Sequence, residues 1–331
     1  MNLIPQKRRR APRILQTGRK AHYHVVSRIN GRAFLLLEKE KELFRNLLAR
    51  VADFCGVRLL TYALLDNHFH LLLEVPETAG NPDDEELRRR ARLIYGKERP
   101  GQPLSFARID LALRAGGTVR EQMRQILIGR MGSLPMFMKI LKQRFSIAYN
   151  KGHDRCGTLW EDRYHSVLVE DRPAVLMAVA AYIDLNPVRA AIVDDPKDYR
   201  FSGYGEAVGK KAGIRSHPLF QMIAERYAES VDEIAAAYRR LLFIKGSNPT
   251  KGGTVSQKAM AKALAQKGEL SAAELLRCRL RFMTRGAILG TQAYIEAWIE
   301  RNKTHIFPKR PRSPRKQTNT ENTPLFSLRN G

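Results

Sequence analysis

The stretch VRLLTYALLDNHFHLLLEV, residues 57–75, decides the fold that this sequence predicts. It contains two β-rich runs, Val57–Leu65 and His68–Val75, with Asp66 and Asn67 between them. Asp and Asn tolerate the backbone dihedrals of a tight turn, so the pattern predicts an antiparallel hairpin. In its second strand, side chains two residues apart project from the same face of the sheet.

Working outward from this hairpin, strand and helix patterns follow one another on both sides. Upstream, the alternating AHYHVVSR (21–28) predicts a strand and EKEKELFRNLLARVADF (38–54) a helix. Downstream, composition turns polar and irregular from 76 to about 130, with short helical stretches, which indicates an insertion or lid outside the core. Beyond it we expect an amphipathic helix over 133–150, a strand over 159–169 and an Ala-rich helix over 171–191.

Charge narrows the choice of partners. The 331 residues allow about two domains. Their net charge is +25, with basic ends: residues 1–20 carry seven Lys or Arg and no acid, and residues 301–331 carry eight against one Glu. Such a charge favours polyanions, with nucleic acid first.

The longest nearly uninterrupted apolar run, 173–183, is too short to span a bilayer, so a cytosolic location is expected. Three widely spaced cysteines indicate neither a disulfide framework nor a zinc site; buried, inert thiols are the default expectation.

The pair His68 and His70 is the strongest chemical signal. On a strand both imidazoles can reach one cation, while Phe69 faces the opposite side. Two imidazoles are too few for a closed zinc tetrahedron, so carboxylate, amide or water ligands would favour Mg²⁺ or Mn²⁺. Two partly buried core histidines are the alternative. A second His-x-His, His22 and His24, lies on the first predicted strand, so spacing alone does not choose between the pairs.

A second signal lies on the Ala-rich helix. Helical spacing places Tyr182 on one face with Asn186, one turn on, and Arg189 is a further candidate for this face. The Asn186-Pro187 step disturbs helical geometry there. A tyrosine on an apolar stripe of a helix is often a core residue whose hydroxyl lies at the edge, and this reading stays open.

Four segments of the sequence together resemble a known family. DNHFHLLLEVPE (66–77), NKGHDRCGTLWEDRYHS (150–166) and AYIDLNPVRAAIVDDPKDYRFSGYG (181–205) are similar, in order, to the signature blocks of the single-tyrosine HUH transposases, and YHVVSRINGR (23–32) fits their first strand. The resemblance is to REP-associated tyrosine transposases, relatives of insertion-sequence-200-like elements. It covers about residues 20–205, and RLRFMTRGAILGTQAYIEAWIE (279–300) resembles the C-terminal extension of some longer members.

The resemblance implies a fold, a site and a reaction. The fold is α+β, a ferredoxin-like antiparallel sheet with helices on one face, followed by a mostly helical C-terminal region. His68 and His70 fall on the metal ligands, Tyr182 on the nucleophile and Asn186 on a polar residue that can complete the metal shell; the pair His22 and His24 does not fall on the motif. The family cleaves and rejoins single-stranded, hairpin-associated DNA through a 5′-phosphotyrosine intermediate with a divalent metal, Mg²⁺ or Mn²⁺.

Binding of single-stranded or hairpin DNA would be mainly electrostatic, with bases stacking on aromatic side chains. The candidate DNA-binding residues are Lys139, Lys142, Arg144, Arg163 and Arg189. The sequence divides into a basic arm (1–20), the transposase domain (21–205, with the insertion at about 76–130), a helical region that could bind DNA (206–303) and a basic tail (304–331). Whether the chain is a monomer or a homodimer is open.

Two other functions remain. The first is a catalytically silent DNA-binding regulator on the same fold. The second is another HUH enzyme, a replication initiator or relaxase. Those enzymes usually carry a helicase domain or several nucleophilic tyrosines, and the absence of a P-loop motif from the sequence argues against a helicase domain.

Overall fold

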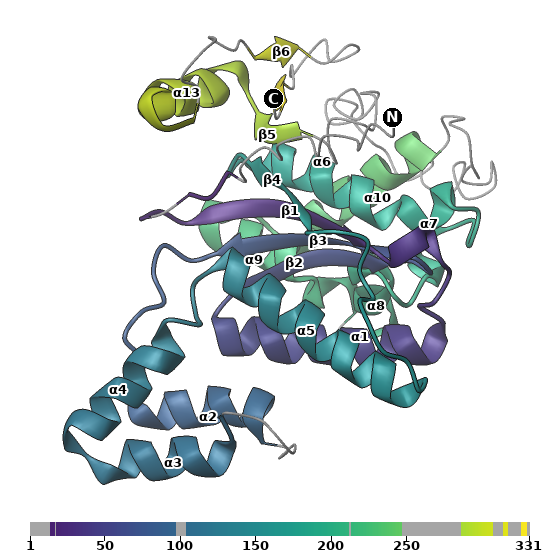
Figure 1. Ribbon diagram of the computed structural model, residues 1–331. Helices are drawn as coiled ribbons and strands as arrows, with labels where there is room; N and C mark the ends of the chain where they lie inside the picture. Colours follow the sequence, from purple (N-terminus) through teal and green to yellow (C-terminus); the bar gives the residue numbers. More distant parts are fainter. Residues whose placement is uncertain are drawn as a thin grey trace, which may run out of the picture.

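A mostly antiparallel sheet runs through the centre of the molecule (Figure 1). The computed structural model describes residues 14–16, 18–96, 104–211, 213–246, 286–306, 314–316 and 326–329. Within these residues seven strands follow the order β2-β3-β1-β4-β5-β7-β6. Neighbours are antiparallel except β4 and β5, which are parallel. The strands are β1 (Ala21–Arg28), β2 (Arg58–Leu64), β3 (His68–Val75), β4 (His165–Val169), β5 (Gly286–Gly290), β6 (Arg315–Lys316) and β7 (Phe326–Arg329).

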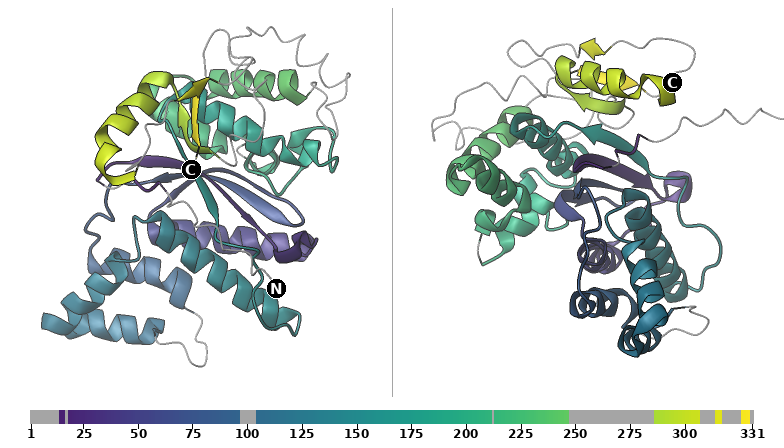
Figure 2. Two further views of the ribbon diagram at one scale, coloured as in Figure 1. Left: turned by 45° about the horizontal axis from the view of Figure 1, so that its top comes forward. Right: turned by 90° about the vertical axis from the view of Figure 1, so that its left-hand side faces the viewer.

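Helices cover both faces of this sheet, as the right-hand view of Figure 2 shows. One face packs against α1 (Glu38–Cys55) and α5 (Leu134–Gly152). The other face packs against α6 (Pro173–Asp184), α8 (Gly203–Gly209), α9 (Pro218–Tyr227) and α10 (Val231–Gly246). The predicted α+β class and antiparallel sheet are confirmed. The expectation of helices on one face is wrong, because β2, β3 and β4 carry apolar side chains of both parities and each face must be covered.

The predicted insertion is helical. It contains α2 (Asp84–Tyr95), α3 (Phe106–Ala115) and α4 (Gly117–Ile128), which extend from the α1 side of the sheet (Figure 1). Asp83 accepts a hydrogen bond from Glu86 N at the start of α2, and Ser105 accepts one from Arg108 N at the start of α3. Leu87, Ile109 and Leu127 are fully buried in the same core as α1, so this segment is part of the folded body.

The C-terminal region adds to the sheet, which the sequence did not predict. β5 pairs with β4 through Leu168 and Ile288, and α13 (Gln292–Ile306) follows it. The Glu170 carboxylate accepts hydrogen bonds from Thr291 N at 2.5 Å and Thr291 Oγ1 at 3.1 Å, just before α13. Most of the predicted basic arm and tail, and residues 247–285 of the helical region, lie outside the described residues.

The cysteines differ in their exposure. Cys55 is buried, and burial raises the pKa of its thiol to about 12, as expected for an inert cysteine. Cys156 is exposed, against expectation, and Cys278 lies outside the described residues. The described helices include none with the length and apolar character needed to cross a bilayer.

His217, at the start of α9, gives a stability prediction. It is fully buried and stacks on Phe220 at 4.3 Å between ring centroids, and neither ring nitrogen has a hydrogen-bond partner among the described residues. Burial lowers its pKa to about 3, with a smaller contribution from Lys210. The folded protein therefore stays neutral at this position while the unfolded chain binds a proton below about pH 6.5, so this stabilisation is lost as the pH falls from 6.5 towards 3.

We expect the wild type to lose about 2 kcal/mol of unfolding free energy through His217 between pH 8 and pH 5. His217→Leu should remove this loss and should raise stability at pH 8 by about 1 kcal/mol, because it removes two buried unpaired nitrogens. Urea unfolding of both proteins at the two pH values measures the effect. Equal pH dependence of wild type and variant would show that His217 is not responsible.

Candidate active site

The histidine pair lies on the face of the sheet that α6 covers. Phe69, Leu71 and Leu73 point into the α1 core, whereas His68 and His70 project to the opposite side. This parity is as predicted. His70 is 1% exposed and lies 5.1 Å from His68 between ring centroids. The hairpin predicted from the sequence therefore presents both imidazoles together.

Each imidazole of the pair has its Nδ1 engaged. His68 Nδ1 donates to Asn67 Oδ1 at 2.6 Å, and Asn67 Nδ2 donates to Arg32 O at 3.2 Å, which fixes the amide orientation. His70 Nδ1 lies 2.9 Å from His24 Nε2. Nε2 is thus the nitrogen that either ring could offer to a ligand.

Both histidines favour the neutral form. Burial, with a smaller contribution from the Arg28 guanidinium, lowers the pKa of His68 to about 4. Burial also holds the pKa of His70 well below its usual range, with the neighbouring His68 and His24 next in effect. Neutral imidazole is the form that binds a metal ion.

Tyr182 packs against this cluster from α6. Its ring centroid is 5.7 Å from that of His70 and 5.7 Å from that of His24, in edge-on geometry. The side chain is 6% exposed. Burial raises the pKa of the phenol, while Arg189 and Arg28 partly offset the shift. The structure thus brings Tyr182 to the histidine pair across the sheet–helix interface.

Asn186 and Arg189 are both tied to the backbone carbonyl of Tyr182. Asn186 Nδ2 donates to Tyr182 O at 2.8 Å, and Arg189 Nη1 donates to the same oxygen at 2.9 Å. The Arg189 guanidinium also lies 4.9 Å from the centre of the Tyr182 ring. α6 ends at Asp184, and the short α7 (Asn186–Arg189) continues it, so the predicted disturbance before Pro187 is only a one-residue break. The amide oxygen of Asn186 is its remaining candidate ligand atom.

A buried carboxylate holds α6 in place. Asp184 accepts hydrogen bonds from Thr61 Oγ1 on β2 at 2.9 Å and from the Tyr238 hydroxyl on α10 at 2.5 Å. Burial raises the pKa of Asp184 to about 7, although these hydrogen bonds favour its charged form. Nearby, a Cβ on Gly203 would lie 2.3 Å from Thr61 Oγ1, so glycine lets α8 approach β2 closely. Asp184 and Gly203 thus give the 181–205 block a structural role around Tyr182.

The remaining predicted DNA-binding residues lie elsewhere. Lys139, Lys142 and Arg144 belong to α5, on the other face of the sheet. Lys142 Nζ donates to Asp162 O at 2.8 Å, and the Arg144 guanidinium is 5.0 Å from the centre of the Tyr95 ring. Arg163 is exposed in the loop before β4. Their role in DNA binding stays a prediction.

Two residues near the site were not predicted. His24, on β1, contacts both His70 and Tyr182. Arg28 pairs directly with His68 in the β1–β3 register and is exposed. The alternation of AHYHVVSR predicts that His24 and Arg28 lie on the same face of their strand. The sequence does not specify which strand pairs with β3. His22, of the same parity, instead pairs with Glu74 at 3.1 Å.

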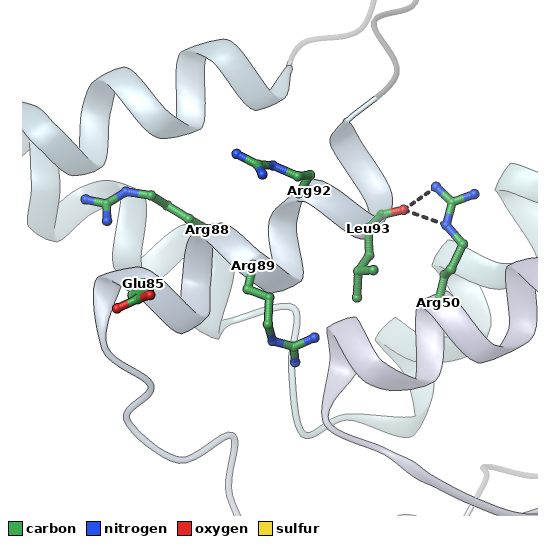
Figure 3. Close-up of a pocket in the computed structure, with 6 residues that line it drawn as sticks. All are labelled: Arg50, Glu85, Arg88, Arg89, Arg92 and Leu93. Atoms are coloured by element: carbon green, nitrogen blue, oxygen red, sulfur yellow. Dashed lines mark hydrogen bonds between the residues drawn. The ribbon is translucent and has the colours of Figure 1, made fainter.

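A pocket of about 580 Å³ lies between α1 and α2, away from this site (Figure 3). Its lining is rich in arginine: Arg50, Glu85, Arg88, Arg89, Arg92 and Leu93. Figure 3 shows the Arg50 guanidinium directed at the Leu93 carbonyl oxygen, with Nε at 2.8 Å. Carboxylates already pair with Arg89 (Asp53, 2.6 Å) and Arg88 (Asp110, 3.3 Å). These ion pairs reduce the net positive charge of the pocket, so we do not propose it as a DNA-binding site.

Metal binding by the histidine cluster is a question of donor chemistry. Among the described residues, no group of three or more His, Cys, Asp or Glu side chains is arranged to hold a metal ion. The available set is two neutral imidazoles and one amide oxygen. Such a set is compatible with a divalent ion that keeps water ligands, and incompatible with a closed zinc tetrahedron.

A His-x-His pair on an antiparallel sheet, facing a tyrosine on a covering helix, is the arrangement expected from the resemblance to HUH transposases. Residues 17–81 match the family model described as Transposase IS200 like. This match confirms the resemblance to insertion-sequence-200-like transposases over the segment that carries β1, β2 and β3.

Comparisons with curated proteins and with solved structures add less to this resemblance than the family model does. None of the curated proteins compared matches the chain. One similar solved structure is the "REP associates tyrosine transposase bound to a REP hairpin", at 15% identity and a TM-score of 0.39 over 61% of this chain and 86% of that one. Another is a putative transposase from Deinococcus radiodurans R1, at 16% identity and a TM-score of 0.26 over 47% and 88%. Both TM-scores are below 0.5, so the similarity to transposases rests on the match of residues 17–81 to the family model.

Proposed function

We propose that this protein is a divalent-metal-dependent transposase that cleaves and rejoins single-stranded, hairpin-associated DNA through a 5′-phosphotyrosine on Tyr182. The observation that carries the proposal is the contact between the Tyr182 ring and the His70 ring, 5.7 Å between centroids. His70 lies within the residues that match the family model, 17–81, and Tyr182 lies outside them. A tyrosine that serves only to fill the core does not require an imidazole beside its ring. The net charge of +25 suits a polyanionic substrate.

The chemistry is a phosphodiester exchange. Tyr182 Oη attacks the scissile phosphorus, the bond to the 3′ oxygen breaks, and the leaving oxygen takes up a proton while the phenol gives one up. One phosphate ester replaces another, so the linkage energy is kept and a second 3′-hydroxyl can reverse the step. No nucleotide cofactor is required.

His68, His70 and Asn186 are the residues that would hold Mg²⁺ or Mn²⁺, through Nε2 of each imidazole and the amide oxygen. When bound, the ion supplies Lewis-acid polarisation of the phosphate oxygens. Arg28 and Arg189 lie near the phenol, and their positive charge would favour the phenolate and the developing phosphate charge.

The test uses the full-length chain with labelled single-stranded hairpin DNA and Mg²⁺ or Mn²⁺. We expect a covalent protein–DNA adduct that mass spectrometry maps to Tyr182, together with a free 3′-hydroxyl on the released strand. An adduct on another tyrosine would remove the assignment. Tight hairpin binding without any adduct would instead identify a catalytically silent DNA-binding protein.

Arg189 gives a further prediction. Arg189→Lys should slow adduct formation by about 10-fold to 100-fold, because an ammonium cannot both donate to Tyr182 O and cover the ring as the planar guanidinium does. Single-turnover kinetics at saturating DNA measure the rate. Arg215→Lys is the control, since Arg215 pairs with Asp232 at 2.7 Å on the surface. An unchanged rate in Arg189→Lys would contradict this role.

A further inference from the structure

His24 is buried at the centre of the candidate site, although the family motif does not include it. It is 1% exposed, and its ring stacks on that of His70 with centroids 5.2 Å apart and planes 20° from parallel. Its Nε2 lies 2.9 Å from His70 Nδ1. The same ring meets the Tyr182 ring edge-on at 5.7 Å. His24 thus contacts both the proposed ligand and the proposed nucleophile.

The hydrogen bond between the two rings has two possible directions. If His24 donates, His70 Nδ1 is the acceptor and the proton of His70 is on Nε2, which then cannot bind a cation. If His70 donates from Nδ1, its Nε2 carries the lone pair. Only the second direction allows His70 to act as a ligand. It gives His70 the same protonation as His68, whose Nδ1 donates to Asn67 Oδ1.

We propose that His24 is a positioning residue that accepts the Nδ1 hydrogen of His70, so that His70 presents an unprotonated Nε2 to the cation site beside Tyr182. This inference rests on the proposed function, because it assumes that His70 is a metal ligand. Partners of this kind fix the tautomer and orientation of a metal-binding histidine, and their loss commonly costs 10-fold to 100-fold in metal affinity.

His22 provides a matched control on the same strand. It has the parity of His24, is equally buried at 1%, and its Nε2 also has a side-chain partner, Glu74 at 3.1 Å. It pairs with Glu74 in the β1–β3 register, four residues beyond His70 along β3. A substitution at His22 therefore perturbs β1 to a similar degree at a distance from the ligand pair.

The first measurement is made on the metal-free, full-length wild type. Nitrogen-15 NMR of labelled histidines, with His70 assigned through His70→Gln, reports which ring nitrogen carries the proton. We expect His70 to be protonated on Nδ1. Protonation on Nε2 would overturn the inference, whatever the protein does with DNA.

The second measurement is Mn²⁺ affinity by titration calorimetry. His24→Phe keeps a stacked ring but removes the acceptor, and should weaken binding 10-fold to 100-fold. His24→Gln keeps an acceptor at nearly the same place and should remain within about threefold of wild type, as should His22→Gln. Equal affinities of His24→Phe and wild type would overturn the inference.

The two measurements separate this inference from the proposed function. If wild type binds no Mn²⁺ and forms no adduct, the proposed function fails, while the His70 tautomer still decides the direction of the hydrogen bond. If wild type binds Mn²⁺ and forms the adduct but His24→Phe does so equally well, the inference alone fails. Should His24→Phe not fold, the wild-type tautomer and His24→Gln remain decisive.

Discussion

Tyr182→Phe should abolish adduct formation, lowering the cleavage rate by about 1,000-fold or more, while the protein stays folded. The substitution removes the attacking oxygen and leaves the ring contacts with His24, His70 and Arg189 in place. Gel separation of the covalent complex with labelled hairpin DNA measures the loss. Hairpin affinity should change by less than about threefold, because binding is mainly electrostatic.

Tyr95→Phe is the matched control for this substitution. Tyr95 is buried on α2, on the other side of the sheet, and its hydroxyl accepts a hydrogen bond from Arg130. The Tyr95→Phe variant should form adducts at the wild-type rate. Full activity of Tyr182→Phe would transfer the nucleophile to another residue.

Removal of either ligand of the histidine pair should have the second largest effect. His68→Ala and His70→Ala should each lower cleavage and Mn²⁺ affinity by about 100-fold or more, since one imidazole and one amide oxygen are too few protein donors. The His70 variant should also lose stability by about 1–3 kcal/mol, because it opens a cavity beside Tyr182 and leaves His24 Nε2 without its partner.

Cleavage rates over a Mn²⁺ titration, with unfolding monitored separately, distinguish ligand loss from structural damage. His153→Ala is the control: His153 contacts Tyr149 and Glu40 beside α5, on the opposite face of the sheet. Wild-type metal dependence in His68→Ala or His70→Ala would refute the assignment of the pair.

Local signals account for the parts of the fold that the sequence predicted well. The strands predicted at 21–28 and 68–75 match β1 and β3 at both ends, because alternation and the Asp66-Asn67 turn act over a few residues. The strand predicted at 159–169 is shorter, as only His165–Val169 pairs along β4, and Trp160 makes an isolated bridge to Ile29. Loop residues with apolar side chains can imitate a strand pattern.

Non-local pairing accounts for the parts that were missed. The position of His24 beside His70 depends on β1 lying next to β3 with Val26 opposite His70, which spacing along one strand does not specify. The second helical layer and the addition of β5 depend on segments far apart in sequence. The candidate site was predicted where one strand or one helix carries it, and missed where two strands meet.

The parallel pairing of β5 with β4 covers one edge of β4. Leu168 and Val169 are fully buried and pair with Ile288 and Leu289. A protein truncated before Gly286 would leave the backbone groups of β4 open along an apolar edge, and such edges recruit strands from other molecules. Shortened versions made to isolate the sheet that carries the histidine pair should therefore aggregate unless a replacement strand or a charged substitution blocks that edge.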